Sequence, residues 1–249
     1  MGWLHAAGWG LFAGFALVIG AALGFSLNIP QRLIAAITAF GSGVLISALS
    51  LDLMEEAYRR GGFDASAAGF IGGALLFTIA TWFLDRRGAK HRKRSGEQQK
   101  KERDQSGSGL AIALGALLDG IPESIVIGLS MLQGKGVSIV TVTAIFLSNL
   151  PEGLSSSSGM KKAGRSAVYV FGVWGGIAVI SGIASLAGFT IFGHFSENVI
   201  AATTATAAGA ILAMLSDTMI PEAFEVAHNF TGLITVAGFL AAFIISKLA

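Results

Sequence analysis

Long apolar stretches alternate with short polar connections along the whole chain. A run of about 20 apolar residues is enough for a helix to cross the hydrocarbon core of a bilayer. Such runs predict eight membrane-spanning helices, at 6–27, 32–54, 65–84, 109–132, 137–159, 166–190, 198–221 and 230–248. We therefore predict an all-α integral membrane protein in which residues 1–249 form a single transmembrane domain, an eight-helix bundle.

The composition agrees with a bilayer environment, because 53% of the residues are hydrophobic and only 13% are charged. Soluble domains contain about 25% charged residues. The 34 glycines include pairs four residues apart, such as Gly20/Gly24 and Gly172/Gly176, a spacing that lets helices approach closely in lipid. The chain has no cysteine, so neither disulfides nor thiolate metal ligands are available.

The one clearly polar segment, residues 85–108, has a composition that predicts a disordered loop. It carries nine of the 17 Lys and Arg residues, and basic loops favour the cytoplasmic side of a membrane. The same side then holds Arg32, Lys161, Lys162 and Arg165, and the other side holds Arg59, Arg60, Lys135 and Lys247. Both termini are therefore expected to face away from the cytoplasm. The loop is interpreted as a solvated charge run, with lipid-headgroup binding as the alternative.

Two of the apolar stretches contain acids near their middle. Asp119 and Glu123 flank Pro122, and Glu152 follows Pro151 directly. A charged side chain at this depth costs about 3 kcal/mol even on lenient scales, so such acids indicate a functional site. Residues three or four apart share one face of a helix, which places Asp119 beside Glu123. Asn149 is placed beside Glu152 in the same way, and Ser148 precedes that pair as a further candidate ligand.

Buried acids need a cation, a proton or a basic partner. No Lys, Arg or His lies near the middle of any of the eight stretches, which leaves a metal ion or shared protons. The structural alternative is that proline and glycine merely kink these helices while the acids are protonated or hydrated. Neither a nucleophile–base pair nor a cofactor fingerprint is present, so we expect no enzyme activity, no organic cofactor and no nucleic-acid partner.

Further acids and a histidine lie where two other stretches end. Asp52, Glu55 and Glu56 end the second stretch and predict a cation-attracting vestibule on the non-cytoplasmic side. Glu222 and His228 follow the seventh stretch and are candidates for a cytoplasmic mouth. Plain water-facing helix ends are the alternative for both groups. The small hydroxyls of residues 155–158 predict either the lining of an exit path or close packing.

In order, spacing and depth, these motifs resemble the ZIP family of divalent metal transporters. Asp119-Gly120-Ile121-Pro122-Glu123-Ser124 sits where the family's fourth helix has His-Asn-x-Pro-Glu-Gly. Ser148-Asn149-Leu150-Pro151-Glu152-Gly153 sits where the fifth helix has a His-x-x-Pro motif. Glu55-Glu56-Ala57 is similar to the family's Pro-Glu-Ala in the second helix, and Pro221-Glu222-Ala223 matches the seventh.

The resemblance implies eight helices, outward termini, a variable cytoplasmic loop after the third helix and a metal site between the fourth and fifth. It carries over Glu123, Asn149 and Glu152 as metal-site positions, and it puts Asp119 and Ser148 where the family usually has histidine. Zinc sites usually include imidazole or thiolate, whereas carboxylate and amide ligands suit Mg, Mn or Ca and are tolerated by ferrous iron. The expected substrate is therefore a divalent cation, Zn, Mn or Fe, with its identity left open.

The leading hypothesis is transport of this cation toward the cytoplasm, through a site between helices four and five. Transporters are often inverted repeats, and helices 1–3 and 6–8 would form such a pair around the central two. The partners are expected to be the lipid bilayer, the metal and a second copy in a homodimer, and the short loops suit a bacterial plasma membrane. The alternatives are a non-transporting membrane sensor or partner subunit, and a proton-coupled carrier of a non-metal solute.

Overall fold

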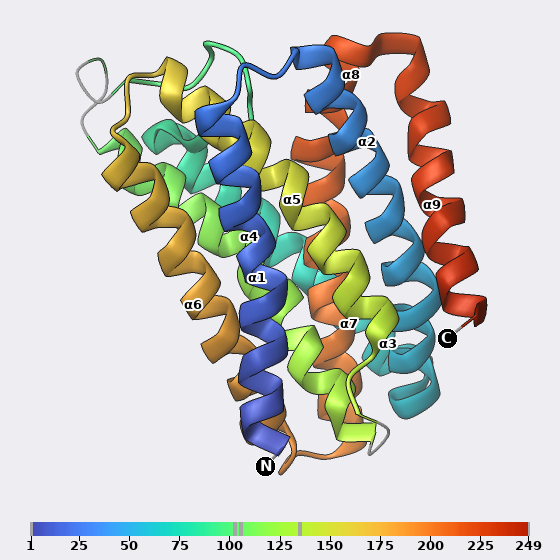
Figure 1. The fold of residues 1–249 in the computed structure, drawn as a ribbon. Coiled ribbons are helices and arrows are strands. Elements are labelled where there is room, and N and C mark those ends of the chain that lie inside the picture. The colour runs from blue at the N-terminus through green and yellow to red at the C-terminus, as the bar shows by residue number, and fades with distance from the viewer. Residues whose placement is uncertain (1, 102–103, 105–106, 134–135, 249) are drawn as a thin grey trace.

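The computed structural model describes residues 2–101, 104, 107–133 and 136–248, and this part of the chain folds as a helical bundle (Figure 1). The α-helices are α1 (Gly2–Ser26), α2 (Gln31–Ala48), α3 (Met54–Leu84), α4 (Ser108–Ser130), α5 (Ile139–Lys162), α6 (Ala167–Phe192), α7 (Glu197–Met214), α8 (Ile220–Ala227) and α9 (Thr231–Leu248). Three π-helices, η1 (Leu49–Leu53), η2 (Asp85–Ala89) and η4 (Leu215–Met219), and two short 3₁₀ helices, η3 (Met131–Gln133) and η5 (His228–Phe230), complete the helical elements.

Among the described residues, five helical stretches are long and apolar enough to cross a membrane. Three of them are α1, α4 and α6, and the other two are the longer stretches Gln31–Ala89 and Glu197–Leu248. The prediction of an all-helical fold with membrane-length helices is thereby confirmed for the described residues, and the number of eight spans stays a prediction. Each of the two longer stretches contains a reversal of the chain, at Gly62 with φ 69° inside α3 and at His228 with φ 47° between α8 and α9. Because L side chains rarely adopt a positive φ, glycine suits the first of these turns.

The helices pack as neighbours that are far apart in sequence. α1 lies against both α5 and α6, α3 runs along α7, and α2 runs along α9, as Figure 1 shows. α4 packs mainly on α6 and only slightly on α5. The backbones of the two helices that carry the predicted acids therefore approach each other closely over little of their length.

Close contact between α1 and α5 depends on small residues, as the sequence predicts. A Cβ atom on Gly20 would lie 2.2 Å from the carbonyl oxygen of Leu150, and one on Gly153 would lie 2.2 Å from the carbonyl oxygen of Leu17. Neither backbone oxygen can yield without moving its helix. These two glycines therefore set the distance between α1 and α5, and with it the position of the segment that carries Glu152.

Two π-helices interrupt the bundle at corresponding places. η1 and η4 each have five residues and begin with Leu-Ser. Three residues after each of them comes a Glu-Ala pair, Glu56-Ala57 after η1 and Glu222-Ala223 after η4. A π-helical turn inserts one extra residue into an α-helix and is frequent at functional sites. It rotates the helix that follows, and here it buries Glu222 inside the bundle.

The polar segment after α3 lies against the bundle in its first part. Residues 85–101 have described positions at one end of the bundle, which we call the loop end, together with the turn at residues 163–166 (Figure 1). Arg92, Lys93 and Gln99 are buried there, whereas Lys90 and Glu97 are exposed. Two residues used in the orientation argument, Arg103 in this segment and Lys135, lie outside the described residues.

Replacing Gly20 by Val should push α1 away from α5. Overpacking of a tight contact costs about 1–3 kcal/mol, so the detergent-solubilised variant should lose several degrees of thermal stability, measured as Tm by circular dichroism. Gly172→Val on α6 is the matched control, because a Cβ atom there meets nothing within 4 Å. Equal Tm values for the two variants would contradict the proposed role of the α1–α5 contact.

Candidate functional site

The predicted acids lie buried on facing parts of α4 and α5. Asp119 and Glu123 of α4 are each 2% exposed, and Glu152 of α5 is 6% exposed. Both helices continue through a proline, Pro122 in α4 and Pro151 in α5. These three carboxylates are thus buried inside the bundle, and their role as metal ligands stays a prediction.

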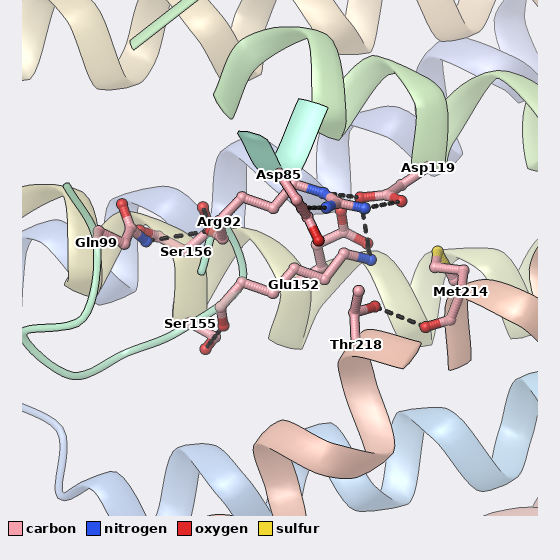
Figure 2. A network of polar contacts seen from close by, with 10 residues as sticks. Asp85, Arg92, Gln99, Asp119, Glu152, Ser155, Ser156, Met214 and Thr218 are labelled. Atoms are coloured by element: carbon pink, nitrogen blue, oxygen red, sulfur yellow. Dashed lines mark hydrogen bonds and ion pairs between the residues drawn. The ribbon is translucent and has the colours of Figure 1, made fainter. Parts of the chain in front are cut away.

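Two cations from the polar segment, Arg92 and Lys93, neutralise this site, and Figure 2 shows Arg92 beside Asp119. The guanidinium of Arg92 donates to both oxygens of Asp119, from Nε to Oδ2 at 3.0 Å and from Nη2 to Oδ1 at 2.9 Å. The ammonium of Lys93 lies between the two helices, 3.4 Å from Oδ2 of Asp119 and 2.9 Å from Oε2 of Glu152. Asp85 approaches the far side of the same guanidinium, at 3.7 Å from Nη1.

The sequence pattern did not indicate these partners, because no basic residue lies near the middle of the apolar stretches. The partners come instead from a segment outside those stretches, which folds back between α4 and α5. Burial alone would lower the pKa of Lys93, but the carboxylates of Asp119 and Glu152 outweigh it and raise the pKa above its usual value. The ammonium is therefore charged at neutral pH and forms a true ion pair with the acids.

The backbone of the basic segment is held by α5. Ser155 Oγ donates to the carbonyl oxygen of Lys93 and Ser156 Oγ donates to that of Arg92, both at 2.5 Å. Gln99 Nε2 donates to three carbonyl oxygens, those of Arg92, Arg94 and Ser156. Figure 2 shows Gln99 beside Ser156. The serines that the sequence offered as an exit lining are thus hydrogen-bonded to this segment.

The other candidate ligands on α4 and α5 have separate roles in this structure. Asn149 donates from Nδ2 to the carbonyl oxygen of Ala13 at 3.0 Å, and Ser148 donates to that of Ile145 at 2.9 Å. Neither oxygen of Glu123 has a hydrogen-bond partner among the described residues. Within this part of the chain, no three His, Asp or Glu side chains converge as a ready-made metal site. The ammonium of Lys93 lies between the carboxylates of Asp119 and Glu152.

A cavity at the end of the bundle opposite the loop end contains the predicted vestibule acids. It has a volume of about 350 Å³ and is lined by Asp52, Glu55, Glu56 and the serine and threonine side chains of α4, α5 and α7, among others. Glu56 is paired with Arg59 and Arg60, whereas Asp52 accepts only a long hydrogen bond, 3.5 Å, from Ser246. The cavity is therefore lined by both acids and arginines, and its role as a cation-attracting vestibule stays a prediction.

The predicted mouth residues at the loop end do not meet. Glu222 is buried and shares the one hydroxyl hydrogen of Ser155 with the carbonyl oxygen of Lys93, while His228 is exposed at the turn and stacks edge-on against Phe224. Arg94 of the basic segment pairs with Glu225. Glu222 therefore adjoins the segment that carries Arg92 and Lys93, and His228 lies apart from it.

Part of the chain is similar to a curated protein. No family model matches the chain. A curated protein, zinc transporter ZTP29 of Arabidopsis thaliana, is 29% identical over 149 residues, which is 55% of this chain and 54% of that protein. The chain thus spans about half the length of the curated relative that it matches.

Replacing Asp119 by Asn should free the basic segment. The substitution leaves the guanidinium of Arg92 buried without an anionic partner, and breaking a buried pair costs about 3–5 kcal/mol. The segment is expected to leave its position, so trypsin should cut after Arg92 and Lys93 at least about tenfold faster, which corresponds to 1.4 kcal/mol. Asp64→Asn, on an exposed part of α3, is the control, and an unchanged cleavage rate in Asp119→Asn would contradict the ion pair.

Proposed function

We propose that this chain transports a divalent metal cation across a membrane through the carboxylate site between α4 and α5. The observation that carries the proposal is the pair Asp119 and Glu152, buried on facing helices with both of their charges offset by cations. An apolar bundle has no structural need for such acids, because well-packed hydrophobic residues are usually as stable or more stable. Acids of this kind suit a site that exchanges cations.

The similarity to a zinc transporter supports a metal as the substrate. Zn, Mn and Fe all remain candidates, because the oxygen donors of Asp119, Glu123, Asn149 and Glu152 favour harder ions than imidazole or thiolate sites do. The metal would displace Lys93 from its place between the carboxylates, and Glu123, which has no hydrogen-bond partner among the described residues, would supply further oxygens.

The path that we propose begins at the acidic cavity beside Asp52 and ends at the loop end near Glu222. In this arrangement the chain crosses the membrane eight times: the reversals at Gly62 and His228 divide the two longest helical stretches, which makes seven crossings, and α5 is the eighth. The loop end faces the cytoplasm, because most of the Lys and Arg residues lie there even when the buried Arg92 and Lys93 are left out. Both termini then lie on the other side.

The π-helices support the proposed inverted repeat. η1 follows α2 and η4 follows α7, and these two helices run in opposite directions through the bundle (Figure 1). Each π-helix leads to a Glu-Ala pair, one near the acidic cavity and one beside the basic segment. Two repeats of opposite direction would place equivalent acids, Glu56 and Glu222, at the two ends of the path.

A second candidate function is a membrane sensor or partner subunit that binds no substrate. It is favoured by one observation, namely that Arg92 and Lys93 already satisfy Asp119 and Glu152. If these ion pairs were permanent, the site would be structural. Uptake measurements separate the two functions.

Glu152→Gln should abolish metal uptake into proteoliposomes, measured separately with Mn, Fe, Co, Zn and Cd. The amide keeps the shape of the side chain but removes the charge that would attract the ion, so the uptake rate should fall by at least about 100-fold, equivalent to roughly 2.7 kcal/mol. Glu97→Gln in the exposed part of the basic segment is the control and should transport normally. Folded wild-type protein that takes up none of these ions would support the sensor function instead.

Removing the acids of the cavity should weaken capture of the ion and leave the later steps intact. In Asp52→Asn/Glu55→Gln we expect the apparent KM to rise several-fold with little change in maximal rate, because long-range attraction speeds encounter. The difference from wild type should shrink at about 1 M salt, where the Debye length is near 3 Å. An effect that is independent of ionic strength would place these acids outside the capture step.

A further inference from the structure

Arg92 and Lys93 occupy the acids that the proposed metal needs, and together they carry two positive charges, as a divalent ion does. We propose that these two side chains are an internal counter-cation pair that competes with the transported metal for Asp119 and Glu152. The inference rests on the proposed function and adds a role for the segment after α3. It assigns two specificity-determining residues that lie outside the apolar helices.

The backbone of Arg92 and Lys93 is held in place by hydrogen bonds from the side chains of Ser155, Ser156 and Gln99, which we call the seat of the pair. Ser155 and Ser156 each donate to one of the two carbonyl oxygens, and Gln99 ties the segment back to α5 through Ser156 (Figure 2). Outside the site, Lys162 Nζ donates to the carbonyl oxygen of Ser95 at 2.9 Å. Four hydroxyl, amide and ammonium groups therefore fix the register that brings Arg92 and Lys93 to the carboxylates.

Two glycines leave the space that the pair requires. A Cβ atom on Gly115 of α4 would lie 2.4 Å from Cδ of Arg92, and one on Gly159 of α5 would lie 2.0 Å from the carbonyl oxygen of Arg94. No Cβ approaches backbone at 2.0 Å, so a larger residue at position 159 would force the segment outward. The helices are shaped for the segment as well as for each other.

The origin of the pair in a connecting segment makes exchange feasible. A Lys or Arg carried on α4 or α5 could leave the site only if a helix moved, whereas residues 90–101 can leave while the bundle stays packed. The charge of the site stays the same when one divalent ion replaces two monovalent side chains, so neither state leaves an uncompensated carboxylate pair in the low-dielectric interior.

The test compares Mn²⁺ affinity of the purified full-length chain in detergent, by isothermal titration calorimetry. In Arg92→Gln/Lys93→Gln the competitor is absent, so Mn²⁺ should bind about tenfold or more tightly, because the binding-competent fraction of the protein rises. Arg87→Gln/Lys90→Gln is the matched control, since it removes two exposed charges from the same segment. Gln99→Ala keeps both cations and all the carboxylates but loosens the seat, so it should raise the affinity by a smaller factor and covers the case in which the double variant does not fold.

A second readout follows the position of the segment itself. The chain has no cysteine, so Ser95→Cys introduces a single, buried thiol. Saturating Mn²⁺, a poor thiolate binder, should increase its rate of maleimide labelling at least about tenfold. Glu97→Cys, at an exposed position, should be labelled rapidly with or without the metal.

The outcomes separate this inference from the proposed function. Tighter Mn²⁺ binding in Arg92→Gln/Lys93→Gln and in Gln99→Ala, with metal-dependent labelling at residue 95, supports the competition. Equal affinities in all variants together with unchanged labelling would overturn it while leaving metal binding in place. Absence of binding in every folded variant, for Mn²⁺ and for Zn²⁺ used in its place, would overturn the proposed function and this inference with it.

Discussion

The structure depends on charge neutralisation in an apolar interior. Asp119 and Glu152 lie among helices whose other faces are suited to lipid, where an uncompensated carboxylate is costly. The neighbouring residues compensate these charges. Arg92 makes a two-bond ion pair with Asp119, Lys93 contacts both acids, and serine hydroxyls hydrogen-bond the backbone that carries the two cations. The slight contact between α4 and α5 follows from it, because the space between them is filled by charged side chains instead of direct helix packing.

The fold was predictable where apolar length and helix-start signals agree. The runs expected at 109–132 and 166–190 correspond closely to α4 and α6, and α6 begins after Ser166, whose hydroxyl accepts a hydrogen bond from the backbone N–H of Tyr169. The π-helices were not predictable, because an extra residue in a helical turn leaves hydropathy unchanged. The reversal at Gly62 was equally hidden among many glycines, and only its positive φ distinguishes it from the packing glycines.

The candidate site was half predictable, for a physical reason. Acids in apolar runs are rare and therefore conspicuous, so Asp119, Glu123 and Glu152 stood out in the sequence. Their partners did not stand out. Arg92 and Lys93 belong to a run of basic residues, and the neighbouring residues in the sequence do not distinguish one member of the run from another. What sets them apart is three-dimensional: the gap left by Gly115 and Gly159, and the hydroxyls of α5. In the sequence those glycines and serines look like ordinary helix-packing residues.

A buried ion pair fixed within helices and one supplied by a connecting segment differ in what they permit. The first can be replaced by apolar residues with little loss of stability, and it rarely has a use that such residues lack. The second is a two-state element, because the same acids can be satisfied by the segment or by another cation while the helices stay where they are. Its position is biased at one end by Ser155, which bonds both the segment and Glu222. Cation binding at Glu222 and cation binding at Asp119 are thus linked through the backbone of residues 92–93. A cation that binds either acid weakens the interaction of the segment with the other acid.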